Sequence, residues 1–219
     1  MRDTFKNELD AINGTLADMG DLVRTAMKHA TTSLLTADND LAEQTIQNDN
    51  EIDDMQHDLD SRALMVMARQ APVASDLRVL VTALRMSSDF ERMGDFAHHI
   101  ARLARMYVPN KVVPQDLEAS VREMGDIADR LVEKLIRVIE TRDADLALQI
   151  EIDDDQMDKL QKKLMTSMLD ASWNHGVEVA INMTLLTRYY ERFADHAVSI
   201  SRRVYFLVTG EYAAPRDQR

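Results

Sequence analysis

The sequence contains no cysteine, and it has few glycines, prolines and aromatic residues. Without cysteine the chain can form neither disulfide bonds nor thiolate metal sites, which fits a reducing compartment. The 219 residues include 6 Gly and 4 Pro, and aromatic residues make up 5%. Together with 14 Met, this composition favours long helices packed by aliphatic and thioether side chains. We find no stretch with the apolar and polar alternation that predicts a β-strand.

The sequence also lacks a long hydrophobic run and a basic stripe. Its longest apolar stretches, such as residues 179–187, are far too short to span a bilayer. Residues 1–6 carry no apolar core of a signal peptide, so we do not expect one. The formal charge of −12 repels nucleic acid, which is therefore not an expected partner. The same charge suits cations or basic surfaces on partner proteins.

Apolar residues recur at alternating intervals of three and four along most of the chain. In the first such segment Leu9, Ile12 and Leu16 begin a series of this kind, which is typical of a helix in a bundle. The pattern predicts an all-α fold. Residues rich in capping or turn-forming types separate the segments, with Ser75 or Asp76 predicted to cap the third and Gly210 the end of the last. The six predicted helices cover residues 4–37, 40–70, 77–107, 115–141, 144–172 and 177–209.

The two halves of the chain match each other in sequence. Residues 19–21, Met-Gly-Asp, recur at 124–126, a separation of 105, and residues 91, 92 and 95 recur at 191, 192 and 195, a separation of 100. The turn around Pro72 accommodates the difference of five residues, because insertions disturb a loop least. We therefore predict two tandem three-helix bundles, with neighbouring helices antiparallel. Residues 1–108 form the first unit, 109–115 a linker, 116–210 the second unit and 211–219 a flexible tail.

Each half carries a pair of carboxylates four residues apart near the middle of its third helix. The pairs are Glu91/Asp95 and Glu191/Asp195, and each places two negative charges one turn apart on the same helix face. Like charges at this spacing weaken a helix by about 0.2–0.5 kcal/mol. Two pairs in register indicate that something offsets the repulsion. A bound cation and the accompanying arginines are the two candidates.

The second helix of each half carries a further carboxylate pair. Antiparallel packing of the second and third helices could bring the two pairs of a unit together, giving an all-oxygen site. Such a site suits hard or borderline cations, namely Mg²⁺, Mn²⁺, Ca²⁺ or iron. The alternative is a solvated acidic helix face of no special function. The candidate metal ligands are Asp49, Asp53, Glu91 and Asp95 in the first unit and Asp154, Asp158, Glu191 and Asp195 in the second.

Other residues near these pairs allow more than one interpretation. Arg92 and Arg192 could orient the carboxylates or contact a partner, or they could form simple intrahelical ion pairs. Asp95 and His98 have the i, i+3 spacing of di-iron carboxylate bundles, but Val198 replaces the histidine in the second half. We find no nucleophile with a base, no glycine-rich phosphate loop and no zinc-protease motif, so we do not expect an enzyme.

The chain resembles the PhoU family of bacterial phosphate-uptake regulators over nearly its whole length. The resemblance rests on the tandem units, on residues 70–78 (Gln-Ala-Pro-Val-Ala-Ser-Asp-Leu-Arg), on the twin Glu-Arg-x-x-Asp motifs and on the ending at residues 205–210 (Tyr-Phe-Leu-Val-Thr-Gly). The family pattern usually has glycine where this chain has Ala194. An Asp-His pair follows in the family pattern. The second unit has this pair as Asp195-His196, whereas Phe96 replaces the histidine in the first unit.

The resemblance implies two three-helix bundles with eight acidic motif residues, which in some family members bind multinuclear iron or zinc. It implies a cytoplasmic negative regulator, with many family members dimeric, that couples the phosphate ABC transporter to the sensor histidine kinase of the phosphate-starvation response. Two other interpretations remain open. One is a metal-storage or oxidase bundle of the di-iron type, and the other is a metal-free helical adaptor.

Overall fold

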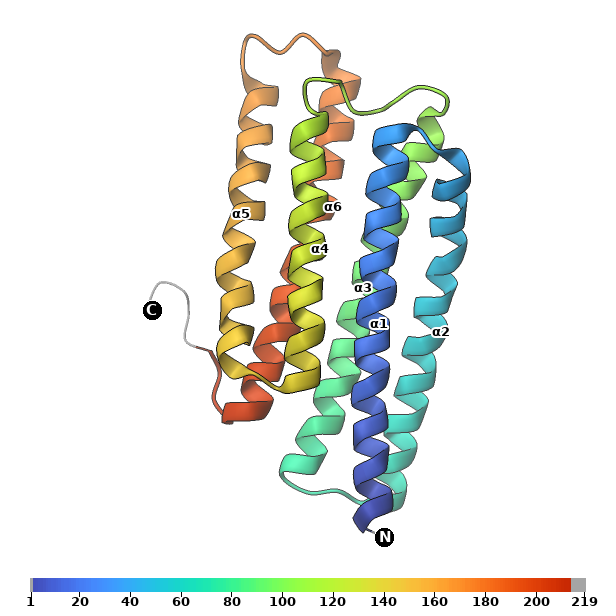
Figure 1. Cartoon of the computed structure of the whole chain (residues 1–219), viewed down its shortest axis with the longest axis vertical. Coiled ribbons are helices and arrows are strands. Elements are labelled where there is room, and N and C mark those ends of the chain that lie inside the picture. Colours follow the sequence, from blue (N-terminus) through green and yellow to red (C-terminus); the bar gives the residue numbers. More distant parts are fainter. Residues whose placement is uncertain (1, 214–219) are drawn as a thin grey trace.

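The fold is all-α, as predicted, in a computed structural model that describes residues 2–213. This part of the chain contains no strand and no helix that is long and apolar enough to cross a membrane. Residues 214–219 of the predicted flexible tail lie outside it. The helices are α1 (Arg2–Thr36), α2 (Asn39–Gln70), α3 (Ser75–Tyr107), α4 (Glu118–Thr141), α5 (Ala144–Leu169) and α6 (Gly176–Thr209) (Figure 1).

The predicted helix ends lie within two residues of those in the structure, except at the start of α4 and the end of α5. Helix α4 begins three residues later than predicted because Leu117 donates its N–H to Pro114 O in a preceding turn. Helix α5 ends at Leu169, since Asp170 is extended and its side chain accepts a hydrogen bond from Ser172 N. Helix α3 has no side-chain cap, so the predicted capping role of Ser75 or Asp76 was wrong.

Two features of the predicted turns are confirmed. Asp38 and Asp143, which are separated by 105 residues, each cap the following helix by accepting a hydrogen bond from the backbone N–H three residues on. Gly210 ends α6 in the left-handed conformation, with a φ of 78°, where a residue without a Cβ is least strained. The N-caps of α2 and α5 are therefore the same in the two units, whereas the C-cap of α3 is Val108 and not a glycine.

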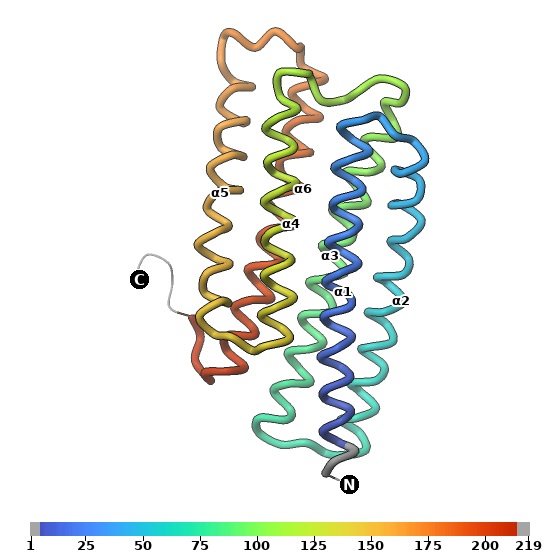
Figure 2. Tube along the Cα trace, in the orientation of Figure 1, coloured from blue at the N-terminus to red at the C-terminus, as the bar shows by residue number. Residues whose placement is uncertain are grey.

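Four helices form a closed ring at the centre of the molecule. Helices α1 and α6 both contact α3 and α4, while α2 lies outside on α1 and α3 and α5 lies outside on α4 and α6 (Figures 1 and 2). Apolar side chains of these four helices line the interior: Ile12, Phe90, Met124 and Phe193, for example, are at most 1% exposed. The two three-helix units thus share one continuous core.

The two units face each other across a local two-fold axis. Helices α1 and α4 run in opposite directions (Figure 2), and equivalent positions of the repeat meet. Arg24 donates to Asp129, its counterpart 105 residues on, with Nε and Oδ1 2.7 Å apart. Gly20 faces Ile136, and Gly125 faces Thr31, which are the same contact with the units exchanged. Such reciprocal contacts define a two-fold interface.

A methyl group at Gly125 is expected to destabilise this interface. A Cβ there would lie 2.6 Å from Thr31 Cγ2. Thr31 cannot easily move away, because its hydroxyl is hydrogen-bonded to Met27 O and to Tyr190 Oη. Gly14 also lies inside α1, but nothing lies within 4 Å of a Cβ built there. Both glycine-to-alanine changes gain the same helix propensity, so the difference between them isolates overpacking.

We expect Gly125→Ala to have a free energy of unfolding about 1–3 kcal/mol below that of Gly14→Ala. Urea denaturation of both variants measures the difference. Equal stabilities would show that the two units can separate at this point without cost.

Candidate functional site

The four predicted ligands of the first unit come from two neighbouring helices and influence each other's charge. Asp49 and Asp53 lie on α2, and Glu91 and Asp95 lie on α3. Burial raises the pKa of Glu91, and the charges of Asp95, Asp53 and Asp49 raise it further. Burial also raises the pKa of Asp49, an effect that His98 opposes and that Asp53 and Asp95 reinforce. The antiparallel packing therefore places the two pairs near enough for their charges to interact.

Asp49 is held from two sides by α3. A Cβ on Gly94 would lie 3.0 Å from Asp49 Oδ1 and 2.9 Å from Ile52 Cδ1, so the glycine permits a close approach of the two helices. His98 Nδ1 lies 2.7 Å from Asp49 Oδ2. The His98 ring therefore contacts a carboxylate of the neighbouring helix. It also lies on the same face of α3 as Asp95, three residues earlier. In the second unit Ala194 and Val198 occupy the equivalent positions.

The second unit repeats this cluster with α5 and α6. Burial raises the pKa of Glu191, and the charges of Asp195 and Asp158 raise it further. Burial also raises the pKa of Asp158, again with a contribution from Asp195. Asp154 is only 7% exposed and lines the same cleft as Asp158 and Asp195. All eight predicted residues thus lie in two clusters, one per unit.

One buried oxygen atom indicates that a cation would fit the second cluster. Glu191 Oε2 is buried without a hydrogen-bond partner among the described residues, while Oε1 accepts a hydrogen bond from Arg188. A buried carboxylate oxygen without a partner is costly, and a cation would remove that cost. Within residues 2–213, however, no three His, Asp or Glu side chains converge closely enough to hold a metal ion. Binding would therefore require side chains such as Asp158 and Asp195, both exposed, to rotate inward.

The arginines of the twin motifs form the intrahelical ion pairs that were one of their predicted roles. Arg92 Nη1 lies 2.7 Å from Asp95 Oδ2, and its Nε lies 3.3 Å from Glu91 Oε2. Arg192 Nη1 lies 3.7 Å from Asp195 Oδ2. Because these side chains are largely exposed, each pair stabilises the helix by less than about 1 kcal/mol. The arginines therefore only partly offset the repulsion between the carboxylates.

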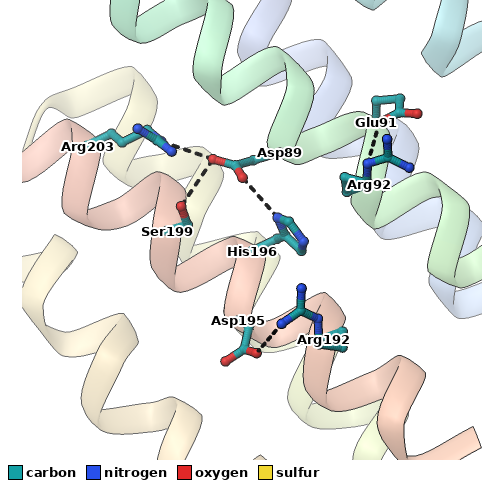
Figure 3. A network of polar contacts seen from close by, with 8 residues as sticks. All are labelled: Asp89, Glu91, Arg92, Arg192, Asp195, His196, Ser199 and Arg203. Atoms are coloured by element: carbon teal, nitrogen blue, oxygen red, sulfur yellow. Dashed lines mark hydrogen bonds and ion pairs between the residues drawn. The ribbon is translucent and has the colours of Figure 1, made fainter. Parts of the chain in front are cut away.

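A polar cluster around Asp89 joins the two units next to these sites (Figure 3). Asp89 Oδ1 lies 2.9 Å from His196 Nδ1, and Oδ2 accepts hydrogen bonds from Ser199 Oγ and Arg203 Nε at 3.2 and 3.0 Å. Burial alone would raise the pKa of Asp89, but the hydrogen bonds and positive charges of His196 and Arg203 outweigh burial and lower that pKa. The carboxylate is therefore stable as an anion at the contact of α3 with α6.

The cluster related to it by the two-fold axis is aromatic. Tyr189 replaces Asp89, Phe96 replaces His196 and His99 replaces Ser199, each 100 residues away. The Tyr189 ring lies 6.3 Å from that of Phe96 and 5.2 Å from that of His99, between centroids. Comparison of the repeats therefore could not reveal Asp89, and the sequence analysis missed it. It also missed Glu151, a buried carboxylate that pairs with Arg202, although Glu151 lies one turn before Asp154.

The arrangement of two repeated units agrees with a comparison against known families. The family model described as "PhoU domain" matches residues 16–104 and again residues 121–204. The chain belongs to the PhoU family. The two matched segments correspond to the two three-helix units, and each contains one acidic cluster.

Relatives in the PhoU family match the chain from end to end. "Phosphate-specific transport system accessory protein PhoU homolog 2" of Mycobacterium tuberculosis is 41% identical over 212 residues, which are 97% of this chain and 100% of the relative. "Phosphate-specific transport system accessory protein PhoU homolog 1" of Mycobacterium leprae is 40% identical over 217 residues, covering 99% of this chain and 97% of the relative. By name, these PhoU relatives are accessory proteins of phosphate transport.

Solved PhoU structures have the same fold. The crystal structure of PhoU from Pseudomonas aeruginosa superimposes with a TM-score of 0.83 at 30% identity, covering 94% of this chain and 100% of that chain. The phosphate transport system regulatory protein PhoU from Streptococcus pneumoniae gives a TM-score of 0.85 at 25% identity, covering 95% and 99%. The six-helix arrangement with two repeated units is thus common to PhoU proteins.

Proposed function

We propose that this protein is a cytoplasmic negative regulator of the phosphate-starvation response and of phosphate uptake. One observation carries the proposal: the chain matches the whole length of a Mycobacterium tuberculosis protein named a phosphate-specific transport system accessory protein, at 41% identity. Every part of that relative therefore has an aligned segment in this chain. In the proposed role, the protein couples the phosphate ABC transporter to its sensor histidine kinase.

The proposal includes a divalent or multinuclear metal at each acidic cluster, with iron, zinc, Mn or Mg as candidates. The ligands would be the predicted carboxylates, Asp49, Asp53, Glu91 and Asp95 in one unit and Asp154, Asp158, Glu191 and Asp195 in the other. The raised pKa values of Glu91 and Glu191 and the unpartnered Glu191 Oε2 support it. When bound, such a cation supplies positive charge that offsets the repulsion within the cluster.

The carboxylates would act by joining helices. In each unit one pair comes from the outer helix, α2 or α5, and the other from the inner helix, α3 or α6. A cluster relieved of its repulsion holds the outer helix against the inner one, which fixes the surface that the two helices present. We propose that this surface, in a homodimer, biases the kinase toward its dephosphorylating state when phosphate is plentiful.

Deletion of the gene in its own host tests this function. We expect a phosphate-starvation reporter to become active in phosphate-rich medium, because the negative regulator is missing, and a wild-type copy to silence it again. A copy with alanine at Glu91, Asp95, Glu191 and Asp195 should fail to silence it. A copy with alanine at Asp18, an exposed residue of α1, serves as the matched control and should silence it fully. A reporter that stays silent after deletion would contradict the proposal.

A further inference from the structure

A cleft of about 510 Å³ lies between α3 on one side and α5 and α6 on the other. It runs along α6, and successive turns of that helix place Asp195, Val198, Arg202 and Phe206 on its wall. Three kinds of side chain therefore follow each other along the cleft. Aromatic rings lie at one end, arginines in the middle and carboxylates at the other end.

The aromatic end consists of two stacked rings. Phe206 and Tyr212 have centroids 4.5 Å apart and planes within 15° of each other. Arg78 lies over Phe206, with its Cζ 4.9 Å from the ring centroid. Tyr212 is 82% exposed, so the ring has surface open to a further planar group. Stacked aromatic rings with an adjacent guanidinium are a common platform for a nucleic-acid base.

Three arginines line the middle of the cleft. Arg203 pairs with Asp89 and Arg202 with Glu151, and Arg85 lines the cleft with them. Arg85 is exposed, so its side chain is accessible to a ligand in the cleft. Guanidinium groups bind phosphate oxygens through two parallel hydrogen bonds. This part of the cleft is thus suited to phosphate groups.

The carboxylate end consists of Asp154, Asp158 and Asp195. Carboxylates beside a phosphate site would repel the phosphate unless a cation lay between them. Magnesium ions in proteins are commonly held by one or two carboxylates together with the phosphates of the bound substrate. The sequence of ring, arginine and carboxylate along the cleft therefore matches the sequence of base, phosphate and cation in a metal-bound nucleotide.

Comparison of the repeats shows that this cleft differs from its counterpart. The positions 100 residues from Arg78, Arg85, Arg203 and Phe206 are Glu178, Leu185, Leu103 and Met106. The carboxylates of the acidic clusters recur in both units, whereas most of the basic and aromatic residues of the cleft occur in one. The basic and aromatic side chains are therefore not needed for a function that the two acidic clusters share.

We propose that this cleft binds a nucleoside di- or triphosphate together with its divalent cation. The base stacks on Tyr212, the phosphates contact Arg85 and the neighbouring arginines, and the cation lies at Asp158 and Asp195. This site goes beyond the proposed regulation and would add a nucleotide signal to it.

Equilibrium dialysis of the purified full-length protein tests the site, with ATP, ADP, adenosine and inorganic phosphate as probes, each with and without Mg²⁺. We expect ATP and ADP to bind in the presence of Mg²⁺ and more tightly than adenosine or phosphate. Arg85→Ala and Tyr212→Ala should each weaken ADP binding by about ten-fold. Arg102→Ala removes the same charge from the equivalent helix face of the other unit and should leave binding unchanged. Circular dichroism confirms that each variant is folded.

Three results would overturn the proposal. The first is an absence of nucleotide binding by the folded wild-type protein. The second is equal affinity for phosphate and ADP with no effect of Tyr212→Ala, which would reduce the cleft to an oxyanion site. The third is an equal loss with Arg102→Ala, which would indicate general charge attraction. None of these results bears on the reporter assay, so the regulatory proposal stands or fails separately.

Discussion

Replacement of Asp89 by alanine is expected to lower the free energy of unfolding by about 3 kcal/mol. The carboxylate is only 13% exposed and forms hydrogen bonds with His196, Ser199 and Arg203 of the other unit. Its removal leaves two cationic or polar side chains and a hydroxyl half-buried without their acceptor, which costs more than the lost attraction alone. The contact of α3 with α6 should weaken most.

Two further variants make this prediction specific. Asp89→Asn keeps the shape and the acceptor oxygen but removes the charge, so its loss should be smaller, about 1–2 kcal/mol. Asp18→Ala removes an exposed carboxylate of α1 and should change stability by less than about 0.5 kcal/mol. Urea denaturation of the three variants provides the comparison. An Asp89→Ala protein as stable as the Asp18→Ala protein would mean that the polar cluster does not hold the units together.

Removal of charge from an acidic cluster is expected to have opposite effects with and without metal. In chelator, a protein with Glu191→Gln and Asp195→Asn should melt at the same temperature as the wild type or higher, because repulsion with Asp158 and the cost of burying Glu191 are relieved. With metal at 100 times its dissociation constant, the wild-type cluster should gain about 2.7 kcal/mol from binding, and the variant cluster should not.

Elemental analysis and thermal unfolding measure the two sides of this prediction. The Glu191→Gln/Asp195→Asn protein should lose about half of the bound metal, and the matched Glu91→Gln/Asp95→Asn protein the other half. The combination of all four changes should abolish metal binding and the metal-dependent rise in melting temperature. If the wild-type protein neither contains nor responds to iron, zinc, Mn or Mg, the acidic clusters are solvated helix faces and the metal has no place in the mechanism.

The sequence predicted the helices well because the long amphipathic segments carry a strong and repeated signal. Ile12 and Leu16, for instance, were assigned to a helix of a bundle from spacing alone and are at most 3% exposed. The start of α4 was less predictable, since Leu117 fits the apolar series of the helix but lies in the turn before it. The spacing of apolar residues does not reveal the hydrogen bond from Leu117 N to Pro114 O, which places Leu117 in the turn.

The candidate site was only partly predictable for a related reason. The eight carboxylates were found because they recur in both units, and recurrence is visible in one sequence. Asp89 and Arg85 do not recur, because their counterparts are Tyr189 and Leu185. The partners of Asp89, such as His196, lie more than 100 residues away and reach it only through the packing of α3 on α6. No spacing rule within one helix detects such a pair.

The local two-fold axis has a consequence for what a fused chain can do that a pair of identical subunits cannot. In a symmetric homodimer, a residue on the axis always meets its own copy, so an arginine there would face an arginine. Here the two copies belong to one chain and can differ. The position on the axis is Arg24 in one unit and Asp129 in the other, and the two form an ion pair. Because the two units are covalently linked and differ in sequence, a position where like charges would repel each other in a homodimer holds an attractive ion pair instead.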